Sequence, residues 1–293
     1  VYAILAYVEA WKGNYVDAEA YTAYVIKNIG VYIIGTIDCV TITNMVSPTG
    51  LFSQEYSNDY KAARLVTFGY RYGTDNANET GTDGHLESWT LAEPLTRKQL
   101  PEIYVSIDTL KNLFMSQFTT DNRFGYDELS KPMKYYSNYV TGLSREYPIF
   151  SKINVVREGK DNTGDFGVFT SFIIWSRFED VLLLRAEALV MLNRPEDAIN
   201  CLNELRGVRN LRNLSYLKDL KGDAKALLKE IFRERRRELM GEGHHWFDRI
   251  REARIVGDDT EMVKLINEGG IYWPVAEEVM RENPSITQNE YWK

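Results

Sequence analysis

The stretch "FRERRRELMGEGHHWFDRIR", residues 232–251, holds six arginines, four acidic residues and two adjacent histidines. The apolar spacing just before it predicts a helix that begins at Gly222-Asp223 and runs toward Gly241. Arg235 lies within the apolar line of this helix, and a buried guanidinium needs carboxylate or carbonyl partners. We therefore predict a structural arginine that ties this helix to its neighbours.

Charges on the same helix fall at i,i+3 spacing, which lets side chains of opposite sign pair along one face. The predicted pairs are Glu230 with Arg233, Glu234 with Arg237, and Arg235 with Glu238. Because these glutamates cancel the positive field of the arginines, the stretch does not indicate a phosphate-binding site.

The adjacent histidines, His244 and His245, raise the question of a metal site. Neighbouring residues on a helix point in different directions, the HExxH spacing is absent, and the only other histidine is His85. We predict no metal ion and no cofactor, and expect a histidine packed at a helix end. Trp246 and Phe247 are expected to pack back into the core.

Two helical hairpins lie outside this stretch. "VYAILAYVEAW" and "YVDAEAYTAYVIKNI" are joined by "KGN" at the start of the chain, and "RFEDVLLLRAEALVML" and "AINCLNELRGV" by "NRPED" from residue 177. A small alanine, Ala18 or Ala198, follows each turn, where two helices can approach closely. Asn193 suits the end of its helix and Pro195 the start of the next. This is the packing of tetratricopeptide hairpins, without their full repeat pattern.

Between the hairpins, residues 31–170 have a different composition, rich in turn residues and aromatics. "VYIIGTIDCVTI" (31–42) is predicted to be strand-like, and "IDTLKNLFMSQF" (107–118) to be one clear helix. The predicted fold is therefore mainly α: one domain, 1–293, with a helical hairpin at 1–30, a loop-rich insertion with minor β structure at 31–170, and a helical scaffold at 171–293.

Composition narrows the function further. The chain has 293 residues, a net charge of −7, 44% hydrophobic residues and 19 tyrosines. An acidic chain does not favour a nucleic-acid binder. No apolar run is long enough to cross a membrane. The two cysteines, Cys39 and Cys201, have no metal or disulfide spacing, and Cys201 is predicted to be a core residue.

The tyrosine-rich part of the insertion carries the binding hypothesis. Sugars offer a C–H face that stacks on aromatic rings and hydroxyls that need carboxylate or amide partners, and "FGYRYGTDN" with "HLESW" supplies both. Aromatic platforms are predicted at Trp89, Tyr70 and Tyr72, with hydrogen-bonding partners at Asn76 and Asp83. Alternation also allows Phe68, Tyr70 and Tyr72 to form one face of a half-buried strand. Trp175 is assigned to the core instead.

Other chemistry finds less support. "NANETGTDGHLE" (76–87) is reminiscent of a calcium loop, but it begins with asparagine and lacks flanking helices, so a polar loop is the expected structure. No nucleophile elbow or phosphate loop is present. A glycan-cleaving enzyme would need two facing carboxylates, and no pair is singled out.

The combined motifs resemble the SusD/RagB family, the nutrient-binding cell-surface lipoproteins of Bacteroidetes. "ERRRELMGEGHHWFDRIR" is similar to the family's arginine-rich helix running into Glu-Gly-His-x-Trp-Phe-Asp, and "RFEDVLLLRAEAL" to the helix before it. "YWPVAEEVMRENPSITQN" resembles the closing segment, and "TTDNRF" a short Asp-x-Arg turn. Family members are normally longer and carry an N-terminal lipid-bearing cysteine; Cys39, preceded by Asp38, does not replace it.

The resemblance implies a non-catalytic protein that captures an oligosaccharide at the outer membrane, held there only by a lipid anchor absent from this chain. It further implies a partner, a SusC-like TonB-dependent transporter into which the ligand passes. The signature residues are then scaffold, and ligand contacts lie in the insertion. The alternative from another class is a tetratricopeptide-type adaptor that binds a peptide or protein segment in a helical groove, which an exposed apolar helix face would favour.

Overall fold

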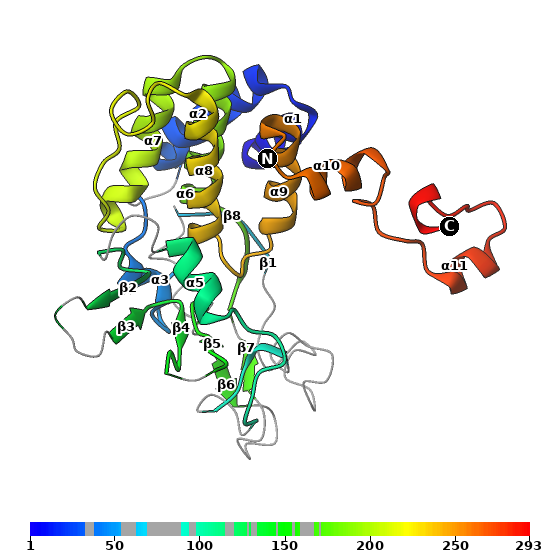
Figure 1. Ribbon diagram of the computed structural model, residues 1–293, viewed down its shortest axis with the longest axis horizontal. Coiled ribbons are helices and arrows are strands. Elements are labelled where there is room, and N and C mark those ends of the chain that lie inside the picture. Colours follow the sequence, from blue (N-terminus) through cyan, green and yellow to red (C-terminus); the bar gives the residue numbers. More distant parts are fainter. Residues whose placement is uncertain are drawn as a thin grey trace.

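The computed structural model describes residues 1–32, 38–53, 63–68, 89–93, 98–114, 120–127, 129, 134–144, 146–153, 156–158, 167–169 and 171–293. Within them, helices form one layer of the molecule and short strands gather below it (Figure 1). The predicted mainly α fold with minor β structure is confirmed.

The scaffold is built from helices that pack largely side by side (Figure 1). In chain order they are α1 (Tyr2–Lys12), α2 (Tyr15–Tyr32), α6 (Phe178–Met191), α7 (Pro195–Val208), α8 (Ala224–Glu238), α9 (His245–Val256) and α10 (Thr260–Asn267). Helix α6 occupies the centre, because it contacts α1, α2, α7 and α8. Its central position explains why nearly every residue of α6 is buried.

Both helical hairpins form as predicted. Ala18 and Ala198 are fully buried, so the helix backbones approach closely at each turn. Gly13 ends α1 with φ 81°, and Asn193 ends the α6 turn with φ 58°, both in the left-handed region that closes a helix. Pro195 occupies the first turn of α7, where its missing N–H leaves no hydrogen bond unmade.

Within the described residues, the short strands pair in four antiparallel ribbons. They are β1 (Arg64–Phe68) with β8 (Ile173–Arg177), β2 (Phe124–Asp127) with β3 (Lys134–Ser137), β4 (Val140–Thr141) with β5 (Ile149–Phe150), and β6 (Val156–Glu158) with β7 (Gly167–Phe169). Strand β8 runs directly into α6, and its Arg177 pairs with Arg64 of β1 in the ladder. The ribbon β1–β8 therefore fastens the insertion to the central helix.

Two predictions within the insertion need correction. The 31–42 segment is not a strand where it is described: Tyr32 ends α2, residues 38–41 are irregular, and Ile42 begins the helix α3 (Ile42–Val46), capped by the Thr41 side chain. A polar cap followed by Ile42 and Met45 suits a short amphipathic turn better than alternation. The predicted helix at 107–118 is described as α5 (Ile107–Phe114), with buried Leu110 and Phe114; its end, Phe118, lies outside the described residues.

Two hydrophobic clusters correspond to the scaffold and the insertion. The first gathers side chains of α6, α7 and α8, and it includes both cysteines, so the prediction that Cys201 is a core residue is confirmed. The second gathers side chains of α3, α5 and β2, including Met45, Leu110 and Phe124. The insertion thus has an apolar core of its own.

The chain ends in an arm, residues 268–293, that extends away from the body in Figure 1. It contains the predicted short helix α11 (Glu277–Glu282) and the 3-10 turn η2 (Glu290–Trp292). Gln288 binds both the N–H and the carbonyl of Val275, at 3.1 and 3.0 Å, and Asn289 donates to the Gly269 carbonyl at 2.8 Å. The Gln-Asn pair of the closing motif therefore fastens the arm's backbone.

Candidate ligand-binding site

The charged stretch is a buried network, and Arg235 shows how it works. Its side chain is fully buried; Nε donates to Asp248 and Nη2 to Asp180, both at 2.8 Å. Arg235 thus joins α8 to α6 and α9, as predicted. The predicted pairing of Arg235 with Glu238 is wrong, because Arg235 is engaged by acids on other helices and Glu238 points elsewhere.

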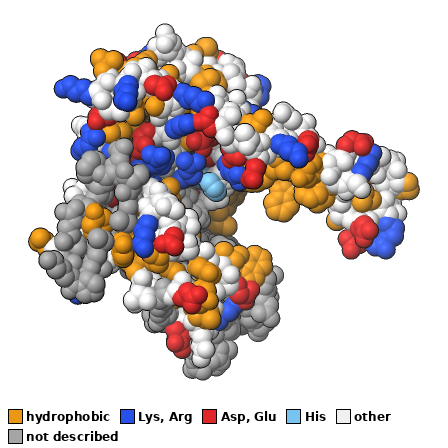
Figure 2. Space-filling model, viewed as in Figure 1, with side chains coloured by type: hydrophobic (Ala, Val, Ile, Leu, Met, Phe, Trp, Pro, Cys, Tyr) orange, Lys and Arg blue, Asp and Glu red, His pale blue; other side chains and the backbone are white. Residues whose placement is uncertain are grey.

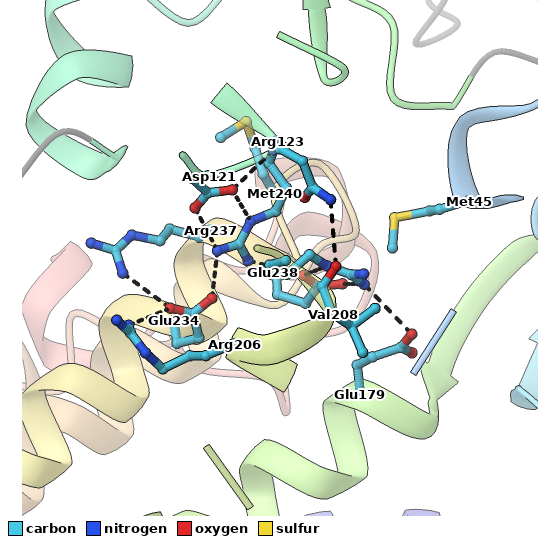
Figure 3. Close-up of polar contacts among 12 residues, drawn as sticks. Met45, Asp121, Arg123, Glu179, Arg206, Val208, Glu234, Arg237, Glu238 and Met240 are labelled. Atoms are coloured by element: carbon cyan, nitrogen blue, oxygen red, sulfur yellow. Dashed lines mark hydrogen bonds and ion pairs between the residues drawn. The ribbon is translucent and has the colours of Figure 1, made fainter. Parts of the chain in front are cut away.

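Glu238 is the centre of the network. Three arginines from three segments reach its carboxylate: Arg123 at 3.0 Å, Arg177 at 2.9 Å and Arg209 at 2.7 Å. Figure 3 shows Glu238 with Arg123 beside it. All four side chains are fully buried. A buried charge is tolerated only when it is paired and hydrogen-bonded, which this arrangement provides.

One turn earlier on α8, Glu234 accepts from Arg123 at 2.5 Å and from Arg237 at 3.0 Å (Figure 3). The predicted pair of Glu234 with Arg237 is confirmed, as is that of Glu230 with Arg233, at 2.9 Å. The first of these pairs is buried, although the i,i+3 spacing alone suggests a helix surface.

The network holds its carboxylates in the ionised form. Burial raises the pKa of Glu234, but Arg123, Arg237 and Arg206 outweigh it and lower the pKa to about 2. For Glu242, burial is likewise outweighed by Arg177 and Lys152, which lower its pKa to about 2. A carboxylate fixed in one protonation state by arginines is unsuited to proton transfer.

The network also joins the insertion to the scaffold. Arg123, fixed by Asp121 of the same turn, inserts between Glu234 and Glu238 of α8. Lys152 follows β5 and donates to the carbonyl of Glu238 at 2.6 Å and to the Glu242 carboxylate. These residues hold elements together, so the stretch that looks richest in chemistry is structural.

The histidines separate into two environments. His244 precedes α9 and is 8% exposed, with Nδ1 3.3 Å from the Tyr7 hydroxyl, so the predicted histidine packed at a helix end is confirmed. His245 is exposed. The expectation that Trp246 and Phe247 return to the core is wrong: they are 36% and 54% exposed, because α9 turns Asp248 and Ile250 inward instead.

Among the predicted ligand contacts, Trp89 is described and is 40% exposed. Its carbonyl accepts hydrogen bonds from the N–H groups of Glu102 and Ile103, at 2.7 and 2.8 Å. Two backbone bonds hold the Trp89 loop against the 102–104 loop. These hydrogen bonds therefore anchor the backbone at Trp89 while its ring faces solvent.

Two tyrosines that sequence reasoning missed extend this surface. Tyr104 is 40% exposed, and its ring meets Tyr147 edge-on with centroids 4.8 Å apart. A hydrogen bond from the Tyr147 hydroxyl to Glu146 raises the pKa of that tyrosine. In the sequence, each tyrosine follows a glutamate within two residues and lies close to a proline. This pattern was the sequence signal that could have identified them as exposed loop aromatics.

We call Trp89, Tyr104 and Tyr147 the aromatic platform. Exposed glutamates, Glu102 and Glu146, accompany it, so flat apolar rings and hydrogen-bond acceptors lie within the same pair of loops. Figure 2 shows hydrophobic side chains exposed on the lower part of the molecule, which the insertion forms. This is the pairing of chemistry that a sugar requires.

The remaining predicted contacts, Tyr70, Tyr72, Asn76 and Asp83, lie outside the described residues, and so do His85 and the calcium-like loop at 76–87. Phe68, at the end of β1, is 59% exposed beside Ile173, its partner in the ladder, which is 60% exposed. The β1 strand therefore presents an apolar surface just before the predicted contacts.

A second aromatic concavity lies between α1, β8 and α9. It has a volume of about 440 Å³ and is lined by Ile4, Tyr7, Val8, Trp11, Lys12, Trp175, Glu242, Gly243, His244, Phe247 and Arg251. Trp175, assigned to the core from its place before α6, is half-buried in this wall, 5.1 Å from the Tyr7 ring. We refer to this feature as the α1 groove.

The described part of the chain contains no group of three or more His, Cys, Asp or Glu side chains arranged to hold a metal ion. No helix among the described residues has the length and apolarity to cross a membrane.

Helical hairpins that support an aromatic, loop-rich surface define a scaffold of tetratricopeptide-like class. The sequence profile of the SusD family matches residues 63–292, which is most of the chain. The chain belongs to the SusD family.

Individual relatives agree with this assignment. A SusD superfamily structure from Bacteroides thetaiotaomicron is similar with a TM-score of 0.82 and 41% identity, over 100% of this chain and 57% of that one. The SusD-like protein P38 of Formosa agariphila is 36% identical over 121 residues, 40% of this chain and 24% of that protein. The chain thus spans little more than half of the length of the solved relative, and its match to protein P38 spans about a quarter of the length of that protein.

A more distant structure shares the fold alone. Surface glycan-binding protein A from Bacteroides uniformis has a TM-score of 0.59 and 16% identity, over 99% of this chain and 60% of that one.

Proposed function

We propose that this protein captures an oligosaccharide at the bacterial cell surface, as a single SusD/RagB-like domain over 1–293. The aromatic platform supplies stacking surfaces and the neighbouring loops supply hydrogen-bonding groups. Tyr70, Tyr72, Asn76 and Asp83 are further ligand contacts in this proposal. They lie within the 20 residues before Trp89 in the sequence.

The observation that carries the proposal is the exposed aromatic platform on a chain of the SusD family. Tyr and Trp rings give large contact areas at a low cost in conformational entropy, and they leave a polar edge for hydrogen bonds. Trp89 and Tyr104 are each 40% exposed, although large aromatic side chains are usually buried to a greater degree.

Further parts of the proposal follow from the family. We infer that the bound glycan passes to a SusC-like TonB-dependent transporter in the outer membrane, with a lipid anchor as the only attachment of this protein to the bilayer. We also infer binding without catalysis. In support, the buried carboxylates of the described residues are neutralised by arginines, as Glu234 and Glu238 show.

The first test is a screen of the protein on a glycan array, followed by calorimetry and by chromatography of the same oligosaccharides after incubation. We expect binding of at least one glycan class and no change in oligosaccharide length. Shortened products would contradict the non-catalytic role, and the absence of binding to every glycan would contradict the proposed function.

A further inference from the structure

A polar hollow lies between the helices α8 and α9, which pack side by side (Figure 1). It has a volume of about 360 Å³ and shares no lining residue with the α1 groove or the aromatic platform. Most of its lining side chains are charged, and they come from α8, from α9 and from the turn before α10. We call this feature the α8–α9 pocket.

Two arginines, one from each helix, line the pocket with part of each guanidinium group unused. Arg236 Nη1 donates to Glu252 and Arg249 Nε donates to Asp259, both at 2.7 Å. Within the described part of the chain, the other nitrogens of these two groups form no hydrogen bond. The Arg236 and Arg249 side chains are 30% and 38% exposed, so a ligand in the pocket can reach them.

The ion pairs around the pocket contain more positive than negative charge. Asp258 pairs with two lysines: Lys229, which lines the pocket, and Lys225 at 2.6 Å, which lies outside the lining. Together with the two arginines, four cations therefore share three carboxylates. One positive charge remains in excess, on a chain whose net charge is −7, and a singly charged anion would neutralise it.

The exposed His245 side chain lines the same pocket and senses this charge. Partial burial, Arg236 and Arg249 lower the pKa of His245, while Asp248 acts in the opposite direction. Positive charge therefore outweighs negative charge at the imidazole ring. An anion bound beside the ring would raise the pKa of His245 again.

The pocket also has an apolar side, because Ala253 and Val256 of α9 line it. The C–H face of a small organic molecule can pack on these side chains. A guanidinium group binds a carboxylate or a similar oxyanion through two parallel N–H bonds, which the unused nitrogens can supply. A volume of about 360 Å³ lies within the range of small-molecule sites.

We propose that the α8–α9 pocket binds a small organic molecule that carries one carboxylate or sulfate group, such as a sugar acid or a sugar sulfate, through Arg236 and Arg249. The pocket is separate from the aromatic platform, so this proposal does not depend on glycan binding there.

The first test compares three ligands with the same sugar ring by calorimetry at low ionic strength: D-glucuronate, D-glucose 6-sulfate and D-glucose. We expect one-to-one binding of at least one of the two anions to the full chain, weakened by added salt, and no binding of D-glucose. Trp89→Ala should bind the anion like the wild type, which separates this site from the aromatic platform.

Substitutions in the pocket test the role of the arginines. Arg236→Gln and Arg249→Gln should each weaken anion binding by about five-fold or more, because each removes charge-assisted hydrogen bonds. Arg233→Gln is the matched control, since Arg233 lies on α8, is 37% exposed and pairs with Glu230, but does not line the pocket. Circular dichroism confirms that all three variants fold.

A pH titration of the His245 ring by NMR gives a second readout, with its signal assigned by its loss in His245→Gln. The bound anion should raise the pKa of His245, and D-glucose should leave it unchanged.

The proposal would be overturned by equal binding of D-glucose, or by the absence of anion binding with a Kd below about 10 mM. An equal loss of affinity in Arg233→Gln would show binding to general surface charge, and an unchanged His245 pKa in the complex would place the anion elsewhere. Loss of anion binding in Trp89→Ala would assign the anion to the aromatic platform. Each of these results also contradicts the proposed site.

Discussion

At the scale of single residues, buried carboxylates organise the arginines around them. Glu238 is contacted by Arg123 from the insertion, Arg177 from β8 and Arg209 from the end of α7. One side chain therefore connects three segments that lie far apart in the sequence. Such a residue is expected to be sensitive to neutralisation, even when the replacement has the same shape.

We expect Glu238→Gln to lower the free energy of unfolding by about 3–5 kcal/mol, because it leaves buried guanidinium groups short of negative charge. Urea denaturation followed by circular dichroism measures this loss. Glu290→Gln is the control, since the Glu290 side chain is 84% exposed and should be replaceable with little effect. A loss below about 1 kcal/mol for Glu238→Gln would contradict the role assigned to the network.

The pKa values of Glu234 and Glu242 predict how stability depends on pH. Both are lowered from the ordinary value of 4.5 to about 2, by arginines and, for Glu242, also by Lys152, which together outweigh burial. The unfolded chain then takes up protons before the folded one, so the stabilisation is complete above pH 4.5 and is lost as the pH falls to about 2.

We therefore expect the urea midpoint of the wild type to fall between pH 4.5 and pH 2, and Glu242→Gln to show a shallower decline over that range. Denaturation series at several pH values measure both slopes. Equal slopes for the two proteins would show that the arginine and lysine partners do not lower the pKa of Glu242 in the folded state.

Sequence reasoning reached part of this picture. The place of Arg235 inside an apolar helix line was enough to predict a buried, structural arginine. The predicted partner of Arg235, Glu238, was wrong. Helical spacing reveals neighbours on the same helix, but it does not reveal the acidic residues on α6 and α9. Glu238 was paired with Arg235 alone, and its true partners were not predicted, since those arginines come from segments 29 to 115 residues away along the chain.

At the scale of elements, the turn after α8 is where the scaffold meets the insertion. Gly241 has φ 78°, and a Cβ there would lie 2.3 Å from the Phe150 ring of β5. Gly243, two residues on, has φ 86° with nothing within 4 Å of its Cβ position. Both glycines adopt the left-handed conformation that the turn requires. Only at Gly241 does the missing side chain also leave space for Phe150 of β5.

This contrast gives a matched pair of variants. Alanine at either position costs about 1–2 kcal/mol for the left-handed conformation. We expect Gly241→Ala to cost a further 1–3 kcal/mol, roughly the range for overpacking, because Phe150 must move. Thermal or urea denaturation of both variants measures the difference, and equal losses would contradict close packing of β5 on this turn.

Element prediction succeeded where local signals were strong. The two hairpins, the start of α8 at Asp223 and the short helix before Pro284 follow from caps, turns and spacing. The strand predicted at 31–42 was wrong at residues 31–32 and 38–42, where the chain is described, because an apolar run suits a strand and a buried helix equally well. The prediction for Trp246 and Phe247 was also wrong, because the pattern of α9 does not reveal which face the neighbouring helices cover.

At the scale of the whole molecule, a rigid helical layer supports an insertion with its own apolar core, and the arginine network holds the two together. Long excursions on a rigid scaffold are where binding surfaces usually form. The sequence predicted a binding surface in the insertion with Trp89 as one of its aromatic platforms, and this remains a prediction. It did not predict Tyr104 and Tyr147, because contacts between loops follow from tertiary packing.

The most direct test of glycan binding by the insertion compares two tryptophans. Calorimetry with the best-binding oligosaccharide should show at least about a five-fold loss of affinity for Trp89→Ala and for Tyr104→Ala, since stacking on an aromatic ring contributes on the order of 1 kcal/mol or more. Trp273→Ala, an equal truncation at the 85%-exposed tryptophan of the arm, should bind like the wild type. Unchanged affinity in the Trp89 and Tyr104 variants, or an equal loss in Trp273→Ala, would contradict the account.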